Sequence, residues 1–546
     1  MPNLPLTVQM VFEHGRRVYA DRRVTAYAPS GERSVSFSEL GAEAERLAAG
    51  LHRLGVRPGE RVASYMWNNP EHLALYFAVP CMGAVLHTVN IRLSEEQTSY
   101  VIDHGGARVA FVDASLAEKL APAAARTAQV DTWIIVGEGQ VPDLPGRVLR
   151  YADVLAEAGT RFDWPELDEN AAASMCYTSG TTGNPRGVAY GHRSTFVHAL
   201  AQCTGSAYGI SHLDTILLIV PMFHANAWGL PYAAWMMGAD LVLPDELLQA
   251  PHLKRMFHEQ RPTFTAAVAT IYKDLLNLGR SEPVDLSSLR VALCGGAPVP
   301  ASLIEAMRET HGVPILQGWG MTETSPSAAV AHPPKDSPAD EELFWRTKSG
   351  RPFAGVQVRI VDPLGAELPW DDDAVGEIEV RGPWVTARYV GEDTPEKFHD
   401  GWLRTGDVGR IDVKGYVQIT DRLKDVIKSG GEWISSVELE NELMGHPEVI
   451  EAAVVAIPDE RWDERPLACV TLREGASTDV AELHAWLGTR VARMSLPERW
   501  ALMREIPKTS VGKFDKKSLR AGYTDSLYEV TTVKKKPAAQ RAAPQP

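Results

Sequence analysis

Short apolar runs alternate with longer segments of amphipathic, helix-like pattern through the first three-quarters of the chain. The runs with the composition of strands lie at 61–67, 107–112, 132–136, 215–220 and 288–293. Regular alternation of strands with helices is typical of α/β proteins. The pattern therefore predicts a large, multi-layer α/β domain in this part of the sequence.

The pattern changes at about Gly350, where strand-like sequence with close turns replaces the alternation. Residues 356–361 and 376–380 have the composition of strands, and 415–420 has it again. We therefore predict a β-rich subdomain within a first domain that spans 1–420.

A charged connector, Asp421-Arg-Leu-Lys-Asp425, follows and predicts a domain boundary. After it, the pattern predicts helices over 437–444 and 480–494 and strands over 452–457 and 467–472. This mixture indicates a small α+β domain over 421–530.

The end of the chain differs from both predicted domains. Residues 531–546 contain the run Lys534-Lys-Lys-Pro537 and further proline and polar residues. Such sequence buries too little apolar surface to fold. We expect a disordered tail there.

Length and hydropathy fit a two-domain protein outside the membrane. At 546 residues the chain exceeds what one hydrophobic core supports. Its longest apolar stretch, 216–223, contains Pro221 and is far shorter than the ~18 residues of a membrane span. The first residues have the pattern of neither a secretory signal nor a transit peptide. We expect a soluble, cytoplasmic protein without a transmembrane segment.

The cysteines and the net charge exclude several classes of function. The five cysteines lie far apart and form no CxxC pair, which argues against a disulfide framework and a zinc site. A formal net charge of −15 argues against general nucleic-acid binding, which needs a basic surface. ATP stays compatible with this charge, because local groups decide binding at close range.

The segment Tyr177-Thr-Ser-Gly-Thr-Thr-Gly-Asn-Pro-Arg-Gly-Val188 concentrates glycines and hydroxyl groups. Glycines let backbone N–H groups approach an anion, and hydroxyl groups donate to its oxygens. A flexible turn of the same composition is the alternative. A Walker A loop is excluded, because GxxxxGK[ST] is absent. The residues expected to bind phosphate are Thr178, Ser179, Gly180, Thr181, Thr182, Gly183 and Arg186.

The sequence as a whole resembles the acyl- and aryl-CoA synthetases of the adenylate-forming superfamily, and within it the medium- and long-chain fatty acyl-CoA ligases. The resemblance implies ATP-dependent joining of a fatty acid to coenzyme A through an acyl-adenylate, with AMP and pyrophosphate as products. Besides the phosphate loop, the matching motifs are Val220-Pro-Met-Phe-His-Ala-Asn-Ala-Trp228, Cys294-Gly-Gly-Ala-Pro298, Gln317-Gly-Trp-Gly-Met-Thr-Glu-Thr324, Gly401-Trp-Leu-Arg-Thr-Gly-Asp407, Asp421-Arg-Leu-Lys-Asp-Val-Ile-Lys-Ser-Gly-Gly-Glu-Trp433 and Pro507-Lys-Thr-Ser-Val-Gly-Lys513.

Three residues take catalytic roles by this resemblance. Attack of a carboxylate on the α-phosphate of ATP brings two anions together, so the site must neutralise charge. Glu323 matches the ligand of a Mg²⁺ ion, which suits a hard oxygen donor, and Thr322 matches a contact to the α-phosphate. Lys513 matches the lysine that stabilises charge passing between carboxylate and α-phosphate. Taken alone, Glu323 would be read as a residue at a helix N-terminus and Lys513 as a solvated surface lysine.

The contacts to the nucleoside follow from the same resemblance. Trp319 takes the aromatic position that stacks on adenine, where many relatives have tyrosine. Asp407 matches the carboxylate that binds the ribose, and Arg422 adds a second ribose contact. A core aromatic and a surface ion pair are the respective alternatives. The other residues that match contacts to the base are Gly296, Gln317 and Gly318.

Two half-reactions with different partners require a moving domain. The resemblance places the hinge at Lys424 and presents Gly430, Gly431 and Glu432 to the channel for coenzyme A. A plain linker with a glycine turn is the alternative.

His224 and Trp228 match the acyl pocket of the resembled ligases, and Trp228 resembles a tryptophan gate. By composition alone Trp228 is equally a core aromatic. The segment has no carboxylate that would receive an α-ammonium group, which favours an apolar acid over an amino acid. Chain length depends on pocket depth, so the resemblance supports medium to long chains without fixing one.

Several other functions share these motifs. A peptide-synthetase adenylation domain, a luciferase-like oxygenase and a ligase for an aryl or other small acid are the catalytic alternatives. A nucleotide-binding regulator without catalysis is suggested by Arg186, where most relatives have lysine. Against it stand Glu323, Asp407 and Lys513, which are all present. The resemblance also suggests a homodimer, as in several long-chain members.

Overall fold

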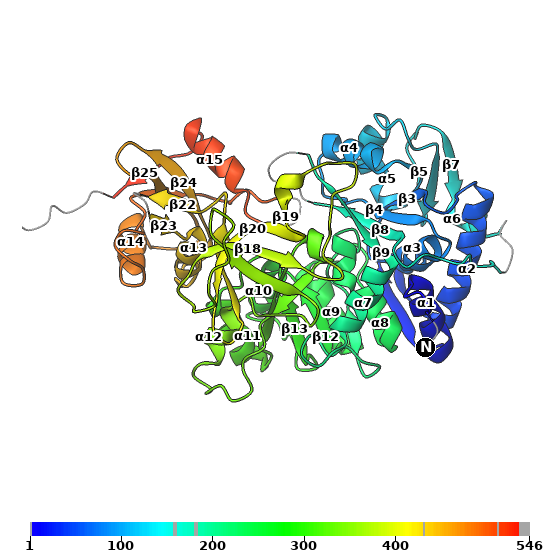
Figure 1. Cartoon of the computed structure of the whole chain (residues 1–546), viewed down its shortest axis with the longest axis horizontal. Helices are drawn as coiled ribbons and strands as arrows, with labels where there is room; N and C mark the ends of the chain where they lie inside the picture. Colours follow the sequence, from blue (N-terminus) through cyan, green and yellow to red (C-terminus); the bar gives the residue numbers. More distant parts are fainter. Residues whose placement is uncertain (1–2, 157–160, 179–183, 430–431, 510–512, 534–546) are drawn as a thin grey trace, which may run out of the picture. The chain divides into compact units, whose positions relative to one another are not determined.

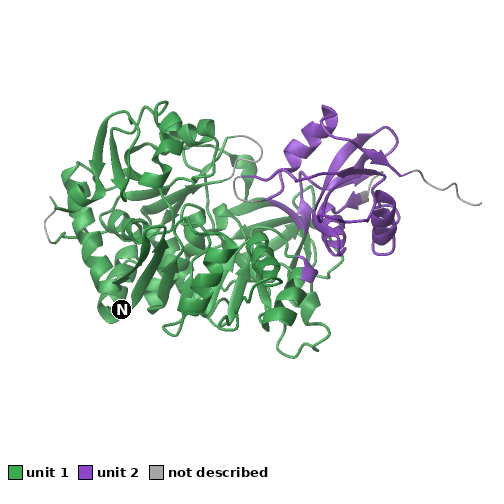
Figure 2. Cartoon of the chain, turned by 180° about the vertical axis from the view of Figure 1, so that it is seen from behind, with its two compact units in different colours: residues 1–299, 303–405, 409–419 green, residues 300–302, 406–408, 420–546 purple. Residues whose placement is uncertain are grey.

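The structure is a computed structural model that describes residues 3–156, 161–178, 184–429, 432–509 and 513–533. The chain divides into two compact units (Figure 2). The larger contains 1–299, 303–405 and 409–419, and the smaller contains 300–302, 406–408 and 420–546.

The larger unit contains a nine-stranded sheet, of which Figure 1 labels strands β12 and β13. Its order is β16-β15-β14-β13-β12-β10-β11-β1-β2, with parallel pairing from β14 to β1 and antiparallel strands at both ends. The strands are β1 Arg23–Ala28, β2 Gly31–Ser36, β10 Thr215–Leu217, β11 Asp240–Leu243, β12 Phe264–Ala267, β13 Val291–Cys294, β14 Ile315–Gly320, β15 Ser327–Val330 and β16 Arg351–Pro352.

A seven-stranded sheet forms a second layer in the same unit. Its order is β7-β6-β5-β3-β4-β8-β9, and only the pair β8–β9 is antiparallel. The strands are β3 Arg61–Tyr65, β4 Val85–Thr88, β5 Ala107–Asp113, β6 Thr132–Val136, β7 Arg147–Arg150, β8 Ala172–Tyr177 and β9 Gly187–Gly191.

Helices cover both faces of each sheet. One hydrophobic cluster joins the inner helices, which lie between the two sheets, to strands of both sheets. Two further clusters join the outer helices to the other face of each sheet. The arrangement is helices, sheet, helices, sheet, helices, which confirms the predicted multi-layer α/β class. The inner helices are α1 Val8–Val18, α2 Phe37–Arg53, α3 Pro70–Cys81, α7 His192–Gln202 and α8 Leu230–Met237; the outer ones are α4 Glu95–Gly105 and α5 Ala114–Ala124 on one side, and α9 Ala250–Gln260, α10 Ala269–Leu278 and α11 Ala301–His311 on the other.

Local sequence sets where these helices begin and how they pack. Ser36 and Glu39 form a capping box at the start of α2, which satisfies two backbone N–H groups. Behind it, the indole of Trp235 stacks on Phe37 at 4.1 Å between ring centres and donates to the carbonyl of Phe12 at 3.1 Å. All three rings are buried, so they fasten α1, α2 and α8 to one another.

The larger unit also contains the strand-rich part that the sequence predicts. Its sheet has the order β17-β18-β20-β19, with β21 also paired to β20. The strands are β17 Gln357–Val361, β18 Gly376–Arg381, β19 Phe398–His399, β20 Trp402–Ile411 and β21 Val417–Arg422. The last two cross from one unit to the other.

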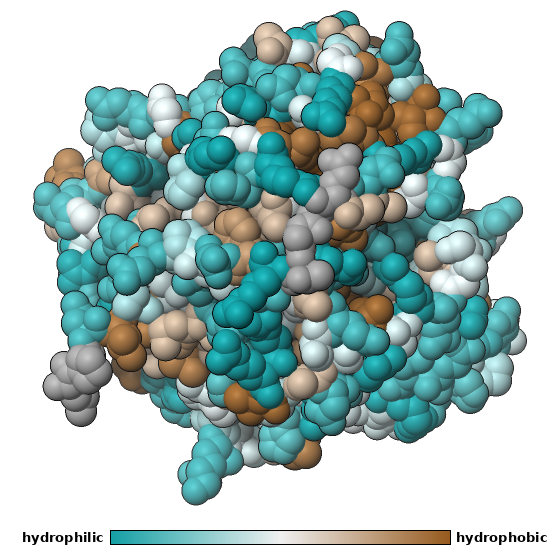
Figure 3. Space-filling model, turned by 90° about the vertical axis from the view of Figure 1, so that its right-hand side faces the viewer, coloured by the Kyte–Doolittle hydropathy of each residue, from teal (hydrophilic) through white to brown (hydrophobic). Residues whose placement is uncertain are grey.

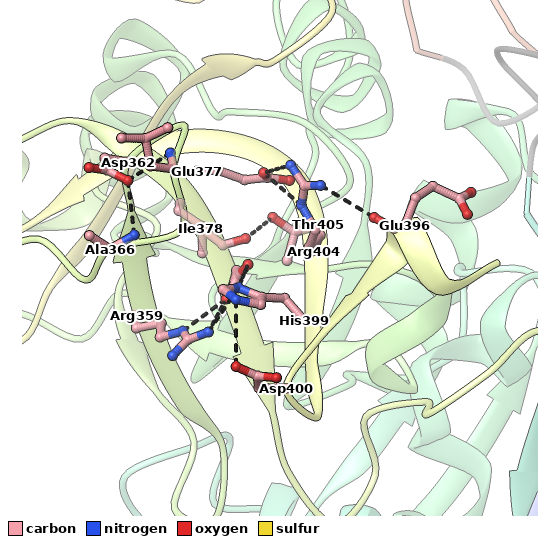
Figure 4. A network of polar contacts seen from close by, with 12 residues as sticks. Arg359, Asp362, Ala366, Glu377, Ile378, Glu396, His399, Asp400, Arg404 and Thr405 are labelled. Atoms are coloured by element: carbon pink, nitrogen blue, oxygen red, sulfur yellow. Dashed lines mark hydrogen bonds and ion pairs between the residues drawn. The ribbon is translucent and has the colours of Figure 1, made fainter.

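Polar contacts fix β20 beside β18 (Figure 4). The guanidinium of Arg404 lies 2.5 Å from Glu377, and the hydroxyl of Thr405 donates to the carbonyl of Ile378 at 2.6 Å. Asp407, a predicted site residue, lies two residues after Thr405 on the same strand.

The smaller unit is an α+β structure. A sheet of order β23-β22-β25-β26-β27, with β24 paired to β25, carries three helices and has its own hydrophobic clusters. The elements are β22 Ile427–Ser429, β23 Glu432–Ile434, α13 Ser436–Met444, β24 Val449–Asp459, β25 Asp463–Leu472, α14 Val480–Gly488, β26 Arg499–Leu502, α15 Lys516–Thr524 and β27 Thr531–Thr532.

Several element boundaries differ from the sequence predictions. The predicted helix 480–494 ends at Gly488, because a weak helix former is followed by a turn closed from Arg490 to Leu487. The strand predicted at 288–293 is β13, which begins only at Val291, because a turn closed from Leu289 to Leu286 precedes it. The strand predicted at 215–220 is β10, which ends at Leu217, where the N–H of Ile219 donates to the carbonyl of Leu217 in a tight turn. Finally, Thr531 and Thr532 of the predicted tail pair with β26.

The surface and the cysteines agree with the composition. Four cysteines are buried and Cys203 is half-buried, and all five are free thiols. The face in Figure 3 is mostly hydrophilic, with hydrophobic patches interrupted by polar side chains. Among the helices of the described ranges, none combines the length and the apolar character that a membrane crossing requires.

Candidate active site

The predicted phosphate loop joins β8 to β9 at the edge of the seven-stranded sheet. At its two ends, the backbone N–H of Thr178 donates to the carbonyl of Arg186 at 2.9 Å, and the N–H of Arg186 donates to Oγ1 of Thr178 at 3.0 Å. The loop is therefore a hairpin between strands, whereas a Walker A loop opens a helix. Five predicted phosphate ligands lie outside the described residues: Ser179, Gly180, Thr181, Thr182 and Gly183.

The side chain of Arg186 lies between an acid and an aromatic ring. Its Nε is 3.0 Å from Oε2 of Glu392, and its guanidinium lies over the ring of Tyr389 at 5.2 Å. The hydroxyl of Tyr389 in turn donates to Oε1 of Glu323 at 2.6 Å. Burial, together with the charge of Glu323, raises the pKa of Tyr389 well above its usual range, so the phenol stays a donor. These contacts link the end of the phosphate loop to Glu323.

Thr322 and Glu323 stand in a short 3₁₀ turn, η2 Thr322–Thr324, directly after β14. The carbonyl of Thr322 accepts from the hydroxyl of Tyr190 at 2.8 Å, and the carbonyl of Glu323 accepts from the N–H of Thr386 at 2.8 Å. Both residues are buried, at 8% and 7% exposure. The turn is thus fixed from two sides, and Glu323 is not part of an α-helix.

The residues predicted to contact adenine lie at the carboxyl ends of the adjacent parallel strands β13 and β14. Gly296 has φ +88°, a left-handed conformation that favours glycine. Gly318 and Trp319 belong to β14, and the indole of Trp319 is 9% exposed. Ligands commonly bind beyond the carboxyl ends of strands in open α/β sheets.

The side chain of Gln317 serves the fold. Its Oε1 accepts from the N–H of Val299 at 2.7 Å, and its Nε2 donates to the carbonyls of Thr347 and Lys348 at 3.2 and 2.8 Å. These bonds use both N–H groups of Nε2, so the side chain of Gln317 has no donor left for a base.

The two predicted ribose contacts are paired with each other. Nε of Arg422 lies 2.6 Å from Oδ1 of Asp407, which is almost fully buried. β21, which carries Arg422, pairs with β20, which carries Asp407. The ion pair orients the carboxylate that the sequence predicts to bind a sugar.

Lys513 and the predicted hinge residue Lys424 lie in the smaller unit, whereas Thr322 and Glu323 lie in the larger. The carbonyl of Lys513 accepts from the N–H of Thr509 at 2.7 Å. Lys424 is exposed, and Glu432 begins β23 opposite Ser429. Gly430 and Gly431 lie outside the described residues.

The predicted acyl-pocket segment has an unusual backbone. His224 precedes η1 Ala225–Gly229, in which Ala225, Asn226, Ala227 and Trp228 all have positive φ, from 43° to 58°. A left-handed conformation costs a non-glycine residue about 1–2 kcal/mol. Trp228 is 9% exposed.

Sequence reasoning missed Tyr389, Glu392 and Asn226 as site residues. Tyr389 is 66 positions from Glu323 and stands in a loop without periodic pattern. Two backbone hydrogen bonds hold that loop at the site: Val390 N–H donates to the carbonyl of Gly187 at 2.8 Å, and Thr386 N–H donates to the carbonyl of Glu323 at 2.8 Å.

Two protein-family models match the chain. The model of the AMP-binding enzyme family matches residues 12–390, and that of the AMP-binding enzyme C-terminal domain matches 438–513. The chain belongs to the AMP-binding enzyme family. The enzyme is an AMP-forming acid–thiol ligase, which confirms the predicted class.

Among its relatives is the long-chain-fatty-acid–CoA ligase of Thermus thermophilus, 41% identical over 94% of each chain. The 3-methylmercaptopropionyl-CoA ligase of Ruegeria lacuscaerulensis is 38% identical over 96% of the enzyme and 99% of the relative. Among solved structures, the anthranilate CoA ligase AuaEII in complex with anthranoyl-AMP superposes with a TM-score of 0.87 at 26% identity, covering 96% and 99% of the two chains.

Proposed function

We propose that the enzyme joins a medium- to long-chain fatty acid to coenzyme A and that the residues described above carry out both half-reactions. The supporting observation is the chain of contacts from Arg186 through Tyr389 to Glu323. These contacts connect a hairpin suited to phosphate with a buried carboxylate. Attack on the α-phosphate of ATP requires both a segment that binds the phosphates and a site that neutralises their charge.

Glu323 would hold Mg²⁺ in this proposal. Its carboxylate is a hard oxygen donor, it is buried, and Tyr389 orients one of its oxygens. Mg²⁺ is commonly held by one or two carboxylates together with substrate phosphates, so a single acidic residue suffices. When bound, the ion neutralises charge on the phosphates. Thr322 would contact the α-phosphate from the same turn.

Asp407 and Arg422 would bind the ribose, and residues at the carboxyl ends of β13 and β14 would bind the base. The buried carboxylate can accept hydrogen bonds from both sugar hydroxyls while Arg422 holds it in place. Gly296, Gly318 and Trp319 would line the base, since they stand at the carboxyl ends of neighbouring strands.

Lys513 would stabilise the charge that passes from the fatty acid carboxylate to the α-phosphate. It lies in the smaller unit, so this role requires that unit to bring it to Glu323. A movement about Lys424 would then present Gly430, Gly431 and Glu432 to coenzyme A.

The acid would lie beside His224 and Trp228. A fatty acid is favoured by the relationship to the long-chain ligase at 41% identity. A short acid is the second candidate, favoured by the 38% relative that acts on 3-methylmercaptopropionate.

A thioester assay separates these candidates. Purified enzyme with ATP, Mg²⁺ and coenzyme A is given straight-chain acids from butanoate to stearate, together with 3-methylmercaptopropionate and anthranilate. We expect kcat/KM to peak at a medium- or long-chain acid. A maximum at butanoate, 3-methylmercaptopropionate or anthranilate would reject the fatty-acid proposal and leave the ligase class intact.

A further inference from the structure

The left-handed segment from Ala225 to Trp228 is the most strained stretch of backbone beside the candidate site. Four consecutive residues other than glycine adopt φ between 43° and 58°. Such a run persists only where its surroundings determine it. The contacts that hold it therefore decide where Trp228 lies.

Asn226 provides most of these contacts. Its Nδ2 donates to Oγ of Ser174 at 2.7 Å, and its Oδ1 accepts from Sγ of Cys176 at 3.0 Å and from Oγ1 of Thr88 at 3.4 Å. The amide is 4% exposed. Burial raises the pKa of the Cys176 thiol to about 11, so the thiol stays protonated and donates.

These partners stand on β4 and β8, which belong to the seven-stranded sheet. Cys176 is two residues before Thr178, where the predicted phosphate loop begins. At the other end of the segment, Nε2 of Gln202 donates to the carbonyl of Trp228 at 2.5 Å. The turn is thus fastened to a rigid sheet and to helix α7.

The fastened turn places the indole of Trp228 against the strands that the nucleotide is proposed to contact. A Cβ at Gly295 would lie 3.2 Å from Cη2 of Trp228 and 3.0 Å from the carbonyl of Gly318. The ring tip therefore lies directly on the backbone beside Gly296. Any shift of the turn would move the indole of Trp228 relative to the positions proposed for the fatty acid and for adenine.

We propose that Asn226 is a positioning residue: its amide, held by Ser174 and Cys176, fixes the left-handed turn and so sets which acyl chains Trp228 admits. The proposal rests on the acid binding beside Trp228. Asn226 itself touches no reacting atom.

The test compares three variants by their profile of kcat/KM against acyl chain length. Asn226→Ala removes the hydrogen bonds and introduces a residue that disfavours positive φ more than asparagine does. It should lower the ratio of kcat/KM between the best and the poorest acid by about tenfold, with the KM for ATP unchanged. Asn226→Gly removes the same bonds but tolerates the turn, so its profile should lie between those of Asn226→Ala and the wild type. Ala227→Gly leaves the amide in place and should keep the wild-type profile.

Two outcomes would overturn the proposal. One is a wild-type profile in Asn226→Ala; the other is an equal loss for every acid, which a purely structural role would cause. If the wild-type enzyme uses no fatty acid, the proposed substrate is rejected. The role of the Asn226 amide is then tested by crystal structures of the wild type and of Asn226→Ala. Asn226→Ala should lose the left-handed φ angles at 225–228, and their retention would refute the role of the amide.

Discussion

The hydroxyl of Tyr389 donates a 2.6 Å hydrogen bond to Oε1 of Glu323. Because burial keeps the phenol protonated, this bond orients a carboxylate that is proposed to hold Mg²⁺. Residues that orient a metal ligand in this way commonly change metal affinity when they are replaced.

We predict that Tyr389→Phe raises the Mg²⁺ concentration needed for half-maximal activity by about tenfold. Excess Mg²⁺ should restore most of kcat, because the ligand itself stays. Initial rates over a Mg²⁺ titration at saturating ATP measure both effects. The matched control is Tyr151→Phe, which removes a similar 2.7 Å bond to Glu43 outside the candidate site. Equal Mg²⁺ dependence in Tyr389→Phe and the wild type would contradict the role.

Arg186 lies at the end of the predicted phosphate loop and is paired with Glu392 at 3.0 Å. We predict that Arg186→Gln raises the KM for ATP by about tenfold, since a hydrogen bond to a charged group contributes about 1.5–3 kcal/mol. Arg193→Gln, which breaks the pair between Arg193 and Glu169 elsewhere, is the control and should leave this KM unchanged. An unchanged KM in Arg186→Gln would exclude Arg186 from nucleotide binding.

The connector around Lys424 is anchored on both sides within the smaller unit. Oδ2 of Asp421 accepts from the N–H and the hydroxyl of Ser436, each at 2.6 Å, and Asp425 pairs with Arg520 at 2.9 Å. Lys516 adds an ion pair to Glu440 at 2.7 Å. A rotation about Lys424 would have to act between these anchors.

We predict that Lys424→Pro slows thioester formation more than adenylation, because proline fixes φ at the proposed pivot. Single-turnover release of pyrophosphate measures the first half-reaction, and formation of acyl-CoA from preformed adenylate measures the second. Lys424→Ala keeps backbone freedom and should retain both rates. Equal losses in the two half-reactions of Lys424→Pro would reject the hinge.

His87 is a buried imidazole on β4, and no hydrogen-bond partner for either ring nitrogen is found among the described residues. Burial first, and then the charges of His104 and Arg61, lower its pKa to about 3. In the unfolded chain it would titrate near pH 6.5, so between these values the unfolded state binds the extra proton. This contribution to stability is therefore lost as the pH falls.

We predict that His87→Leu removes this dependence. The free energy of unfolding of the wild type should fall relative to the variant by about 1.4 kcal/mol per pH unit between about pH 6 and about pH 4. Urea unfolding at several pH values measures the difference. His258→Leu, at an exposed position of α9, is the control. A pH-independent difference between His87→Leu and the wild type would contradict the assignment.

The sequence predicted those parts of the site that lie close together along the chain. The glycines and hydroxyl groups of 177–188 indicated the loop that joins β8 to β9, although its two strands were not predicted, and motif resemblance indicated Glu323 and Asp407. Tyr389 and Asn226 could not be found in this way, because their partners come from other strands and depend on side-chain packing. The end of α14 at Gly488 was missed because apolar periodicity continues where the backbone turns.

Transfer of ¹⁸O from the fatty acid to AMP would show that the reaction passes through an acyl-adenylate. The enzyme is given ATP, Mg²⁺, coenzyme A and palmitate labelled with ¹⁸O in both carboxylate oxygens, and the products are analysed by mass spectrometry. In the proposed reaction a carboxylate oxygen attacks the α-phosphorus and pyrophosphate leaves; the thiol of coenzyme A then displaces AMP from the acyl carbon. One ¹⁸O atom should therefore appear in AMP for each acyl-CoA formed. Unlabelled AMP, or label in inorganic phosphate with ADP as the nucleotide product, would contradict the account.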